Sequence, residues 1–188
     1  MPIHWVLCYL ITSTSKGDAI FAQSRIGRDE KPFFMYKYRS MRQDCDDAIH
    51  RQFLEQLNAN ADQDAFGEDD APLKMVEDPR ITKIGHFIRK TSLDEIPQFF
   101  NVFKGDMSLV GPRPCLDYEM QAMEGWEHNR FLCKQGVTGF WQVYGRSRCS
   151  LKQSHFLDCL SAFVCSPSYH LMLIIKTPIV MLQQKGAF

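Results

Sequence analysis

The sequence has no excess charge of either sign. Its 188 residues include 22 Lys and Arg and 22 Asp and Glu, so the formal net charge is zero. Domains that bind nucleic acid are usually strongly basic, and this composition argues against that class. It also has no internal repeat and no low-complexity tract. Hydrophobic residues make up 45% of the chain, which is enough to build the core of one domain.

Paired cysteine motifs are also missing. The seven cysteines are odd in number, and no two of them form a C-x-x-C pair. Neither a disulfide framework nor a zinc site is expected from this pattern, and free thiols in a reducing compartment are the better interpretation. We therefore expect a protein that faces the cytoplasm.

The two apolar stretches are too short to cross a bilayer. A helix over residues 3–11 would reach about half of a hydrocarbon core about 30 Å thick, at about 1.5 Å per residue. No basic residue precedes this stretch, which disfavours a signal peptide. The second stretch, 169–184, is interrupted by Lys176, Thr177 and Pro178. We expect it to pack on the domain or to lie in a membrane interface.

Charged residues gather in one stretch, residues 78–114, which reads DPRITKIGHFIRKTSLDEIPQFFNVFKGDMSLVGPRP. Two adjacent carboxylates, Asp94 and Glu95, have basic residues on both sides, an arrangement that suits anion chemistry. The flanking basic residues are Arg80, Lys83, Arg89, Lys90, Lys104 and Arg113. Arg113 stands between two prolines, which predicts a guanidinium held for bidentate contact with a phosphate.

A helix is predicted to begin close to the two acids. Ser92 and Glu95 have the spacing of a capping box, and an apolar run follows until Gly105 supplies a stop. Pro97 fits only the first turn, which favours a cap one or two residues after Ser92. Asp94 would then lie at the positive end of the helix dipole, an effect of about 0.3–1 kcal/mol that favours its ionised form. The structural alternative is that both acids are ordinary caps.

The other patterns indicate an α+β protein, mainly helical, as a single domain with small antiparallel β-hairpins and amphipathic surface helices. Strand-like runs at 19–23 and 33–39 predict a hairpin in which Lys37 and Arg39 project from one face. These two cations are either solvated at the edge of the sheet or bind a phosphate group. The remaining expected elements are helices over 46–57, from 78 towards 88 and over 116–131, a polar loop over 58–71, and a strand over 137–144.

The central stretch resembles the core of the bacterial sugar transferase family, the monotopic phosphoglycosyl transferases that start exopolysaccharide, O-antigen and glycoprotein glycan assembly. The matching segments are 78–85, 89–98, 101–110 and 111–114. A second family signature, Pro-Gly-x-Thr-Gly-x-x-Gln-x-x-Gly-Arg, is similar to 135–146, with Gln135 in place of proline. The resemblance thins over 147–167, and His170 stands where an acid is common.

The resemblance implies a chemistry for the two acids. Asp94 would attack the sugar-proximal phosphorus of a UDP-sugar, expel UMP and form a covalent intermediate from which a polyprenyl (undecaprenyl) phosphate takes the sugar phosphate. Glu95 would bind a metal ion or transfer a proton. Mg²⁺, at Asp94 and Glu95, suits this site because it takes hard oxygen ligands. The implied phosphate-binding residues are Arg89, Arg113, Lys37, Arg39 and Arg25, with secondary roles for Arg146, Gln142 and Asp106.

The resemblance also implies a membrane surface as partner, at the cytoplasmic face of the bacterial inner membrane, with peripheral or monotopic attachment. Residues 1–15 would be part of an N-terminal membrane-associated helix that begins at the remnant of a Ser-Pro bend, Pro2, and lacks its entering arm. The alternative is an amphipathic helix buried under the domain. Residues 16–188 would form the catalytic domain, with a flexible insertion at 42–77.

Two other functions stay open at this point. A catalytically impaired, truncated relative would act as a nucleotide-sugar-binding scaffold. A nucleotide-sugar hydrolase would use the same aspartate but send the intermediate to water. Among donors, the resemblance implies UDP-galactose or UDP-glucose, because the acidic insertion before Asp78 is similar to that of the family branch that uses them.

Overall fold

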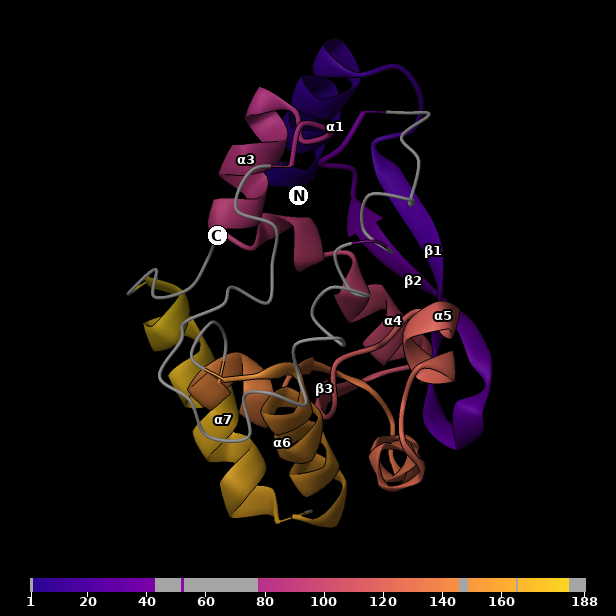
Figure 1. Cartoon of the computed structure of the whole chain (residues 1–188). Helices are drawn as coiled ribbons and strands as arrows, with labels where there is room; N and C mark the ends of the chain where they lie inside the picture. Colours follow the sequence, from indigo (N-terminus) through magenta and orange to yellow (C-terminus); the bar gives the residue numbers. More distant parts are fainter. Residues whose placement is uncertain (1, 43–51, 53–77, 146–148, 165, 183–188) are drawn as a thin grey trace.

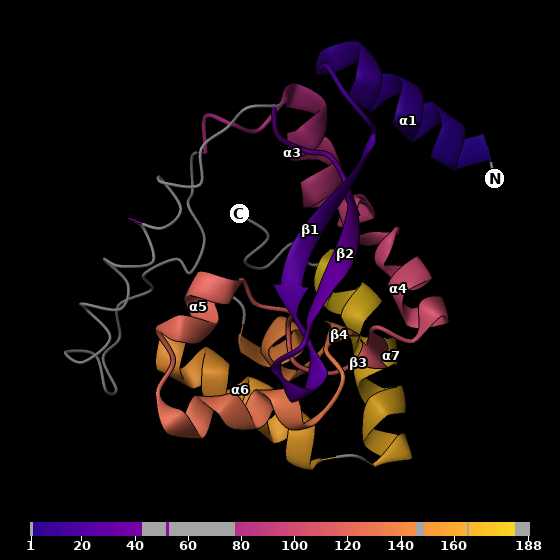
Figure 2. The same ribbon diagram turned by 90° about the vertical axis from the view of Figure 1, so that its right-hand side faces the viewer.

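The computed structural model describes residues 2–42, 52, 78–145, 149–164 and 166–182. An antiparallel hairpin runs along one side of the described structure and joins its two ends (Figures 1 and 2). Its parts are β1 (Ile20–Ile26), the 3₁₀ turn η1 (Arg28–Glu30) and β2 (Pro32–Tyr38). Phe21 of β1 lies opposite Lys37 of β2. The predicted hairpin is confirmed.

At one end of the hairpin, helix α1 (Pro2–Thr14) lies beside helix α3 (Lys83–Lys90) (Figure 1). Leu7, Ile11 and Ile88 form a small core there together with Tyr38. Burial of these apolar side chains fixes α1 on the hairpin. None of the helices in the described part of the chain is both long enough and apolar enough to cross a membrane.

The region of the two acids differs from the predicted single helix. It divides into a 3₁₀ turn, η2 (Leu93–Glu95), and helix α4 (Gln98–Lys104). Ser92 has a φ of 53° and makes no side-chain cap, which agrees with the preference for a later cap, but α4 begins later than the predicted one or two residues after Ser92. The proline without an N–H begins α4, and Gly105, with a φ of 88°, ends it as predicted. Because Asp94 lies in the turn before α4, the helix-dipole argument does not apply to it.

A second strand pair lies between the hairpin and the C-terminal helices (Figure 2). Strand β3 (Ser108–Val110) pairs with strand β4 (Gly136–Thr138), and the pair is parallel. The predicted strand over 137–144 is too long, because a π-helical turn, η4 (Trp141–Gly145), follows. Phe140 and Val143 turn into the core there and pack with Val110 and Leu173.

Two elements, α5 (Asp117–Gln121) and the 3₁₀ segment η3 (Gly125–Leu132), contact the other end of the hairpin. The C-terminal helices α6 (Leu151–Phe163) and α7 (Pro167–Leu182) lie farther from the hairpin (Figure 1), where α6 packs on η3 and α7 on the second strand pair. The predicted helix over 116–131 is thus broken in two. The helix expected from residue 78 begins only at Lys83, where the Thr82 side chain accepts a hydrogen bond from Gly85 N at 2.9 Å.

The α+β class is confirmed, although one of the two strand pairs is parallel rather than antiparallel. The C-terminal apolar stretch packs on the domain through Leu173, which is fully buried, while other apolar side chains of α7 stay exposed. The helix predicted over 46–57 and the loop over 58–71 lie outside the described residues.

Candidate active site

Asp94 and Glu95 converge on a single cation, Lys37 of strand β2. Lys37 Nζ lies 3.0 Å from Glu95 Oε1 and 4.0 Å from Asp94 Oδ2. Asp94 is buried, with 8% of its surface exposed, and the tight η2 turn holds it next to Glu95. A nearby cation favours the charged carboxylate, which is the form that acts as a nucleophile or binds a metal ion.

Arg89, in the last turn of α3, brings a second positive charge to Asp94. Its Nε donates a hydrogen bond to Ser40 Oγ at 2.9 Å. Burial lowers the pKa of Arg89; the negative charge of Asp94 raises it again, and the positive charge of Arg113 is among those that lower it. The Arg89 guanidinium therefore lies within electrostatic reach of both the carboxylate and the second arginine.

The position of Arg89 depends on a close approach between α3 and the backbone after β2. A Cβ atom on Gly85 would lie 2.0 Å from Ser40 O, so only glycine permits this contact. Thr82 N also donates to Ser40 O at 3.0 Å. The carbonyl group of Ser40 thus accepts a hydrogen bond from the residue before α3, and its hydroxyl group accepts one from Arg89. Sequence reasoning missed Ser40, because its partner lies 49 residues away.

The segment that carries Arg113 is held by its backbone. Four consecutive carbonyl groups accept hydrogen bonds: Pro112 O from Gly136 N (2.8 Å), Arg113 O from Arg130 Nη2 (2.8 Å), Pro114 O from Arg25 Nη1 (3.2 Å) and Cys115 O from Ile26 N (2.9 Å). The Arg113 guanidinium lies over Trp141, 5.2 Å from the ring centroid. Within the described residues no ion pair holds that guanidinium, so its charge is available to an external anion.

The two family-like motifs meet through their glycines. A Cβ on Gly136 would lie 2.1 Å from Gly111 N, and one on Gly139 would lie 2.2 Å from Gly111 O. The reverse also holds, since a Cβ on Gly111 would lie 2.9 Å from Gly136 N. The backbones of the two motifs are therefore in direct contact, and the second motif forms the support on which Arg113 rests.

Two of the predicted phosphate-binding arginines are engaged with the protein itself. Arg25 is buried, donates to Pro114 O and lies 3.7 Å from Glu119; burial lowers its pKa. Arg39 follows the end of β2, and its guanidinium donates to Lys16 O at 2.6 Å and to other carbonyls of the loop before β1. Arg25 therefore supports the segment of Arg113, and Arg39 holds a loop.

Two of the three secondary candidates, Asp106 and Gln142, lie within the described residues. Asp106 pairs with Lys104 at 3.1 Å and follows the end of α4. Gln142 belongs to the π-helical turn beside Trp141, and its role stays a prediction. Arg146 lies outside the described residues.

Asn101 is a residue that the sequence reasoning missed. It is completely buried, its Oδ1 accepts from Tyr36 N at 3.0 Å, and its Nδ2 donates to Phe34 O at 2.7 Å. The side-chain amide thus pairs with the free edge of β2 as a further strand would. This contact ties α4 to the strand that carries Lys37. The sequence signal that could have found it is an asparagine within the apolar run 99–103.

The two acids meet the requirements of Mg²⁺. Both carboxylates approach one cationic point, Lys37 Nζ, so their oxygens are able to share a small hard cation. No group of three or more His, Cys, Asp or Glu side chains in the described residues forms a metal cage. Mg²⁺ does not need one, because it binds one or two carboxylates together with substrate phosphates and water.

A largely apolar pocket of about 450 Å³ lies between α1, the hairpin and the start of α4. Its lining is His4, Ile20, Tyr36, Tyr38, Ile96, Pro97 and Phe100. Because side chains alternate along a strand, Tyr36 and Tyr38 project from the face of β2 opposite to Lys37. The pocket and the charged groups therefore share strand β2 and the segment after η2, but they do not share lining residues.

Comparison with known proteins gives one consistent result. The sequence model of a family described as bacterial sugar transferase matches residues 1–184. A UDP-galactose-lipid carrier transferase of Erwinia amylovora is 39% identical over 188 residues, which cover 100% of this chain and 38% of that protein. An undecaprenyl-phosphate galactose phosphotransferase of Salmonella typhimurium is 39% identical over 187 residues, with the same coverage. The exopolysaccharide production protein ExoY of Rhizobium meliloti is 29% identical over 187 residues, 100% of this chain and 80% of ExoY. The chain thus spans less than half the length of the first two relatives.

Proposed function

This chain belongs to the bacterial sugar transferase family, and from that premise we propose that it transfers a sugar 1-phosphate from a UDP-sugar to a polyprenyl phosphate. The observation that carries the proposal is the buried Asp94 carboxylate, 4.0 Å from Lys37 Nζ and within electrostatic reach of Arg89. The names of the relatives supply the substrate class. The first two relatives are named for galactose, so UDP-galactose is the donor we propose.

The first step would form a covalent enzyme. An Asp94 carboxylate oxygen attacks the sugar-proximal phosphorus, a new oxygen–phosphorus bond forms, and the bond from that phosphorus to the oxygen of UMP breaks. The electron pair leaves with UMP. Lys37, Arg89 and Arg113 offset the negative charge that gathers around phosphorus. When bound at Asp94 and Glu95, Mg²⁺ would supply further charge neutralisation at the phosphates.

The second step would release the enzyme. A phosphate oxygen of the polyprenyl phosphate attacks the same phosphorus, and the bond between that phosphorus and Asp94 breaks. The products are a polyprenyl diphosphate sugar and the free carboxylate, so no oxidant or further reactant is needed. The apolar pocket lined by Tyr36, Ile96 and Phe100 would receive part of the hydrocarbon chain.

We further propose that the protein acts at the cytoplasmic face of the inner membrane. Trp5 and Tyr9 of α1 are 72% and 73% exposed, and Phe103 of α4 is 90% exposed. Exposed aromatic side chains of this kind favour the membrane interface. Flotation with vesicles of anionic phospholipid tests this: the wild-type protein should float, and a variant with Trp5→Ser and Tyr9→Ser should float less.

The decisive test is release of UMP from a panel of UDP-sugars by detergent-solubilised protein, with and without undecaprenyl phosphate. We expect lipid-dependent release and complete loss of transfer in Asp94→Asn, with an unchanged fold by circular dichroism. Near wild-type turnover by Asp94→Asn would refute the nucleophile. Release of free sugar phosphate without lipid would instead indicate a hydrolase. Binding of UDP-galactose without any UMP release, even after an N-terminal membrane helix is added, would indicate a scaffold.

A further inference from the structure

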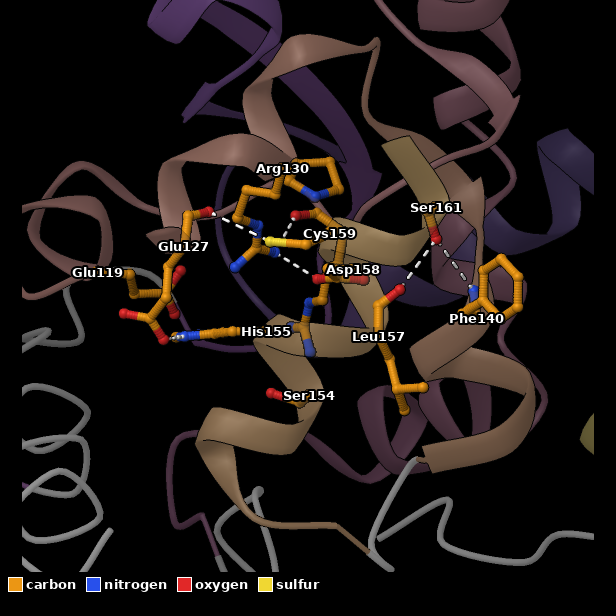
Figure 3. Close-up of polar contacts among 12 residues, drawn as sticks. Glu119, Glu127, Arg130, Phe140, Ser154, His155, Leu157, Asp158, Cys159 and Ser161 are labelled. Carbon is orange, nitrogen blue, oxygen red and sulfur yellow. Dashed lines mark hydrogen bonds and ion pairs between the residues drawn. The ribbon is translucent and has the colours of Figure 1, made fainter. Parts of the chain in front are cut away.

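A buried ion pair contacts the backbone of Arg113 from outside the candidate site. Arg130 of η3 and Asp158 of α6 are each 4% exposed at their side chains, with Nη2 and Oδ2 2.5 Å apart. The same Arg130 Nη2 donates to Arg113 O at 2.8 Å. Figure 3 shows the pair between η3 and α6, with Cys159 and His155 beside it. One guanidinium nitrogen therefore joins the ion pair to the backbone of Arg113.

The carbonyl group of Arg113 is the point at which this pair contacts the backbone. Burial raises the pKa of Asp158, whereas Arg130, His155 and the backbone amide of Arg113 lower it. Since Pro112 and Pro114 have restricted backbones, fixing the peptide groups of Arg113 fixes the direction in which its side chain leaves the backbone.

The pair is poorly arranged for stability alone. It meets through one nitrogen and one oxygen, and Arg130 Nε and Asp158 Oδ1 are buried without a hydrogen-bond partner within the described residues. Replacing a buried ion pair by apolar side chains is often neutral or stabilising. Apolar side chains in the same space would therefore give similar stability. They would not form the hydrogen bond to the carbonyl group of Arg113.

We propose that Arg130 and Asp158 are positioning residues for the transfer reaction: they fix the backbone of Arg113 so that its guanidinium, stacked over Trp141, meets a phosphate of the nucleotide sugar. The inference rests on the proposed function. Small displacements of such a group cost about 10²-fold in rate. The loss should appear in kcat/KM for the UDP-sugar and not in the fraction of folded protein.

The chain offers a matched control in the same interface. Glu127 of η3 and His155 of α6 form a second buried polar contact, between Oε1 and the ring nitrogen Nδ1 (Figure 3). His155 lies one helical turn before Asp158, and neither Glu127 nor His155 has a described hydrogen bond to Arg113. His155→Gln should therefore change stability without moving the arginine.

The test replaces both charges at once, with Arg130→Met and Asp158→Leu in one protein. We expect a folded protein whose kcat/KM for UDP-galactose falls by about 10²-fold, while His155→Gln stays within about twofold of wild type. Adding Arg113→Ala to the double variant should cost much less than Arg113→Ala costs alone, because residues in one network are not additive. A folded double variant with wild-type kcat/KM overturns the proposal. If the double variant does not fold, Arg130→Lys decides by the same measure, since lysine keeps the charge but its shorter side chain loses the hydrogen bond that Nη2 donates to Arg113 O.

A second readout does not depend on activity. Because both neighbours of Arg113 are prolines, its amide is the only exchangeable backbone N–H between Gly111 and Cys115. Hydrogen–deuterium exchange resolved to this amide should be faster in the double variant than in wild type. Equal rates overturn the positioning role. If wild type transfers no sugar phosphate at all, the proposed function fails, and faster exchange in the variant still supports the backbone clamp.

Discussion

Removal of the Asn101 amide should separate helix α4 from strand β2. In Asn101→Leu, the side chain keeps its approximate volume but loses its hydrogen bonds to Tyr36 N and Phe34 O, which measure 3.0 Å and 2.7 Å. Because the side chain is completely buried, water does not replace either bond. Each backbone group left without a partner costs about 1–3 kcal/mol, so we expect the free energy of unfolding to fall by about 2–6 kcal/mol.

This loss is large for a single domain, whose total stability is about 5–15 kcal/mol. Urea denaturation followed by tryptophan fluorescence measures it, and Asn129→Ala is the control. The amide of Asn129 also bonds a backbone carbonyl, Trp126 O at 2.8 Å, but the contact is exposed, so that variant should stay within about 0.5 kcal/mol of wild type. A loss below about 1 kcal/mol in Asn101→Leu would refute the reasoning, because it would mean that both backbone groups find other partners.

Three further predictions concern the site and its support. Lys37→Met removes the ammonium that both carboxylates share, and kcat/KM for UMP release should fall by more than about tenfold; an unchanged value would show that Lys37 takes no part. Gly136→Ala places a Cβ 2.1 Å from Gly111 N and should cost about 1–3 kcal/mol in urea denaturation, where a neutral result would contradict the close contact. The hydrogen bond from Arg80 lowers the pKa of Asp78, so the stability from this pair is full above the usual Asp range and is lost as the pH falls through the lowered pKa. Asp78→Asn should flatten that acid part of a pH–stability curve, and an identical curve would argue against the pair.

The sequence predicts elements well where local patterns decide the structure. The hairpin forms as predicted because its aromatic runs and its turn are adjacent in the chain. Gly105 ends α4 because glycine adopts the positive φ of this position without strain. The capping box at Ser92 fails for a different reason. Its spacing is a local signal, but Pro97 starts the helix later and leaves Glu95 to pair with Lys37. Tertiary contact overrides the local pattern.

The sequence identifies the charged residues of the candidate site but only some of their contacts. Arg89 reaches Asp94 because few residues separate them, so spacing alone indicates their proximity. Arg25 was expected to bind phosphate, but its partner, Pro114 O, lies 89 residues away, and no local pattern reveals such a distance. Asp158 did leave a signal, since a carboxylate in the middle of a helix with apolar neighbours implies a buried partner. Its partner, Arg130, is not identifiable from the sequence.

The glycine contact between the two motifs also limits how this protein is able to exchange parts with its relatives. A chimaera joined anywhere between residues 111 and 136 would inherit Gly111 from one parent and Gly136 with Gly139 from the other. A Cβ added to any of these three glycines would lie 2.1–2.3 Å from a neighbouring backbone atom. Even a small difference in loop path between the parents would therefore push the two halves apart. Domain shuffling for new sugar specificity should therefore place its crossover points before residue 111 or after residue 139, and move this interface as a single inherited unit.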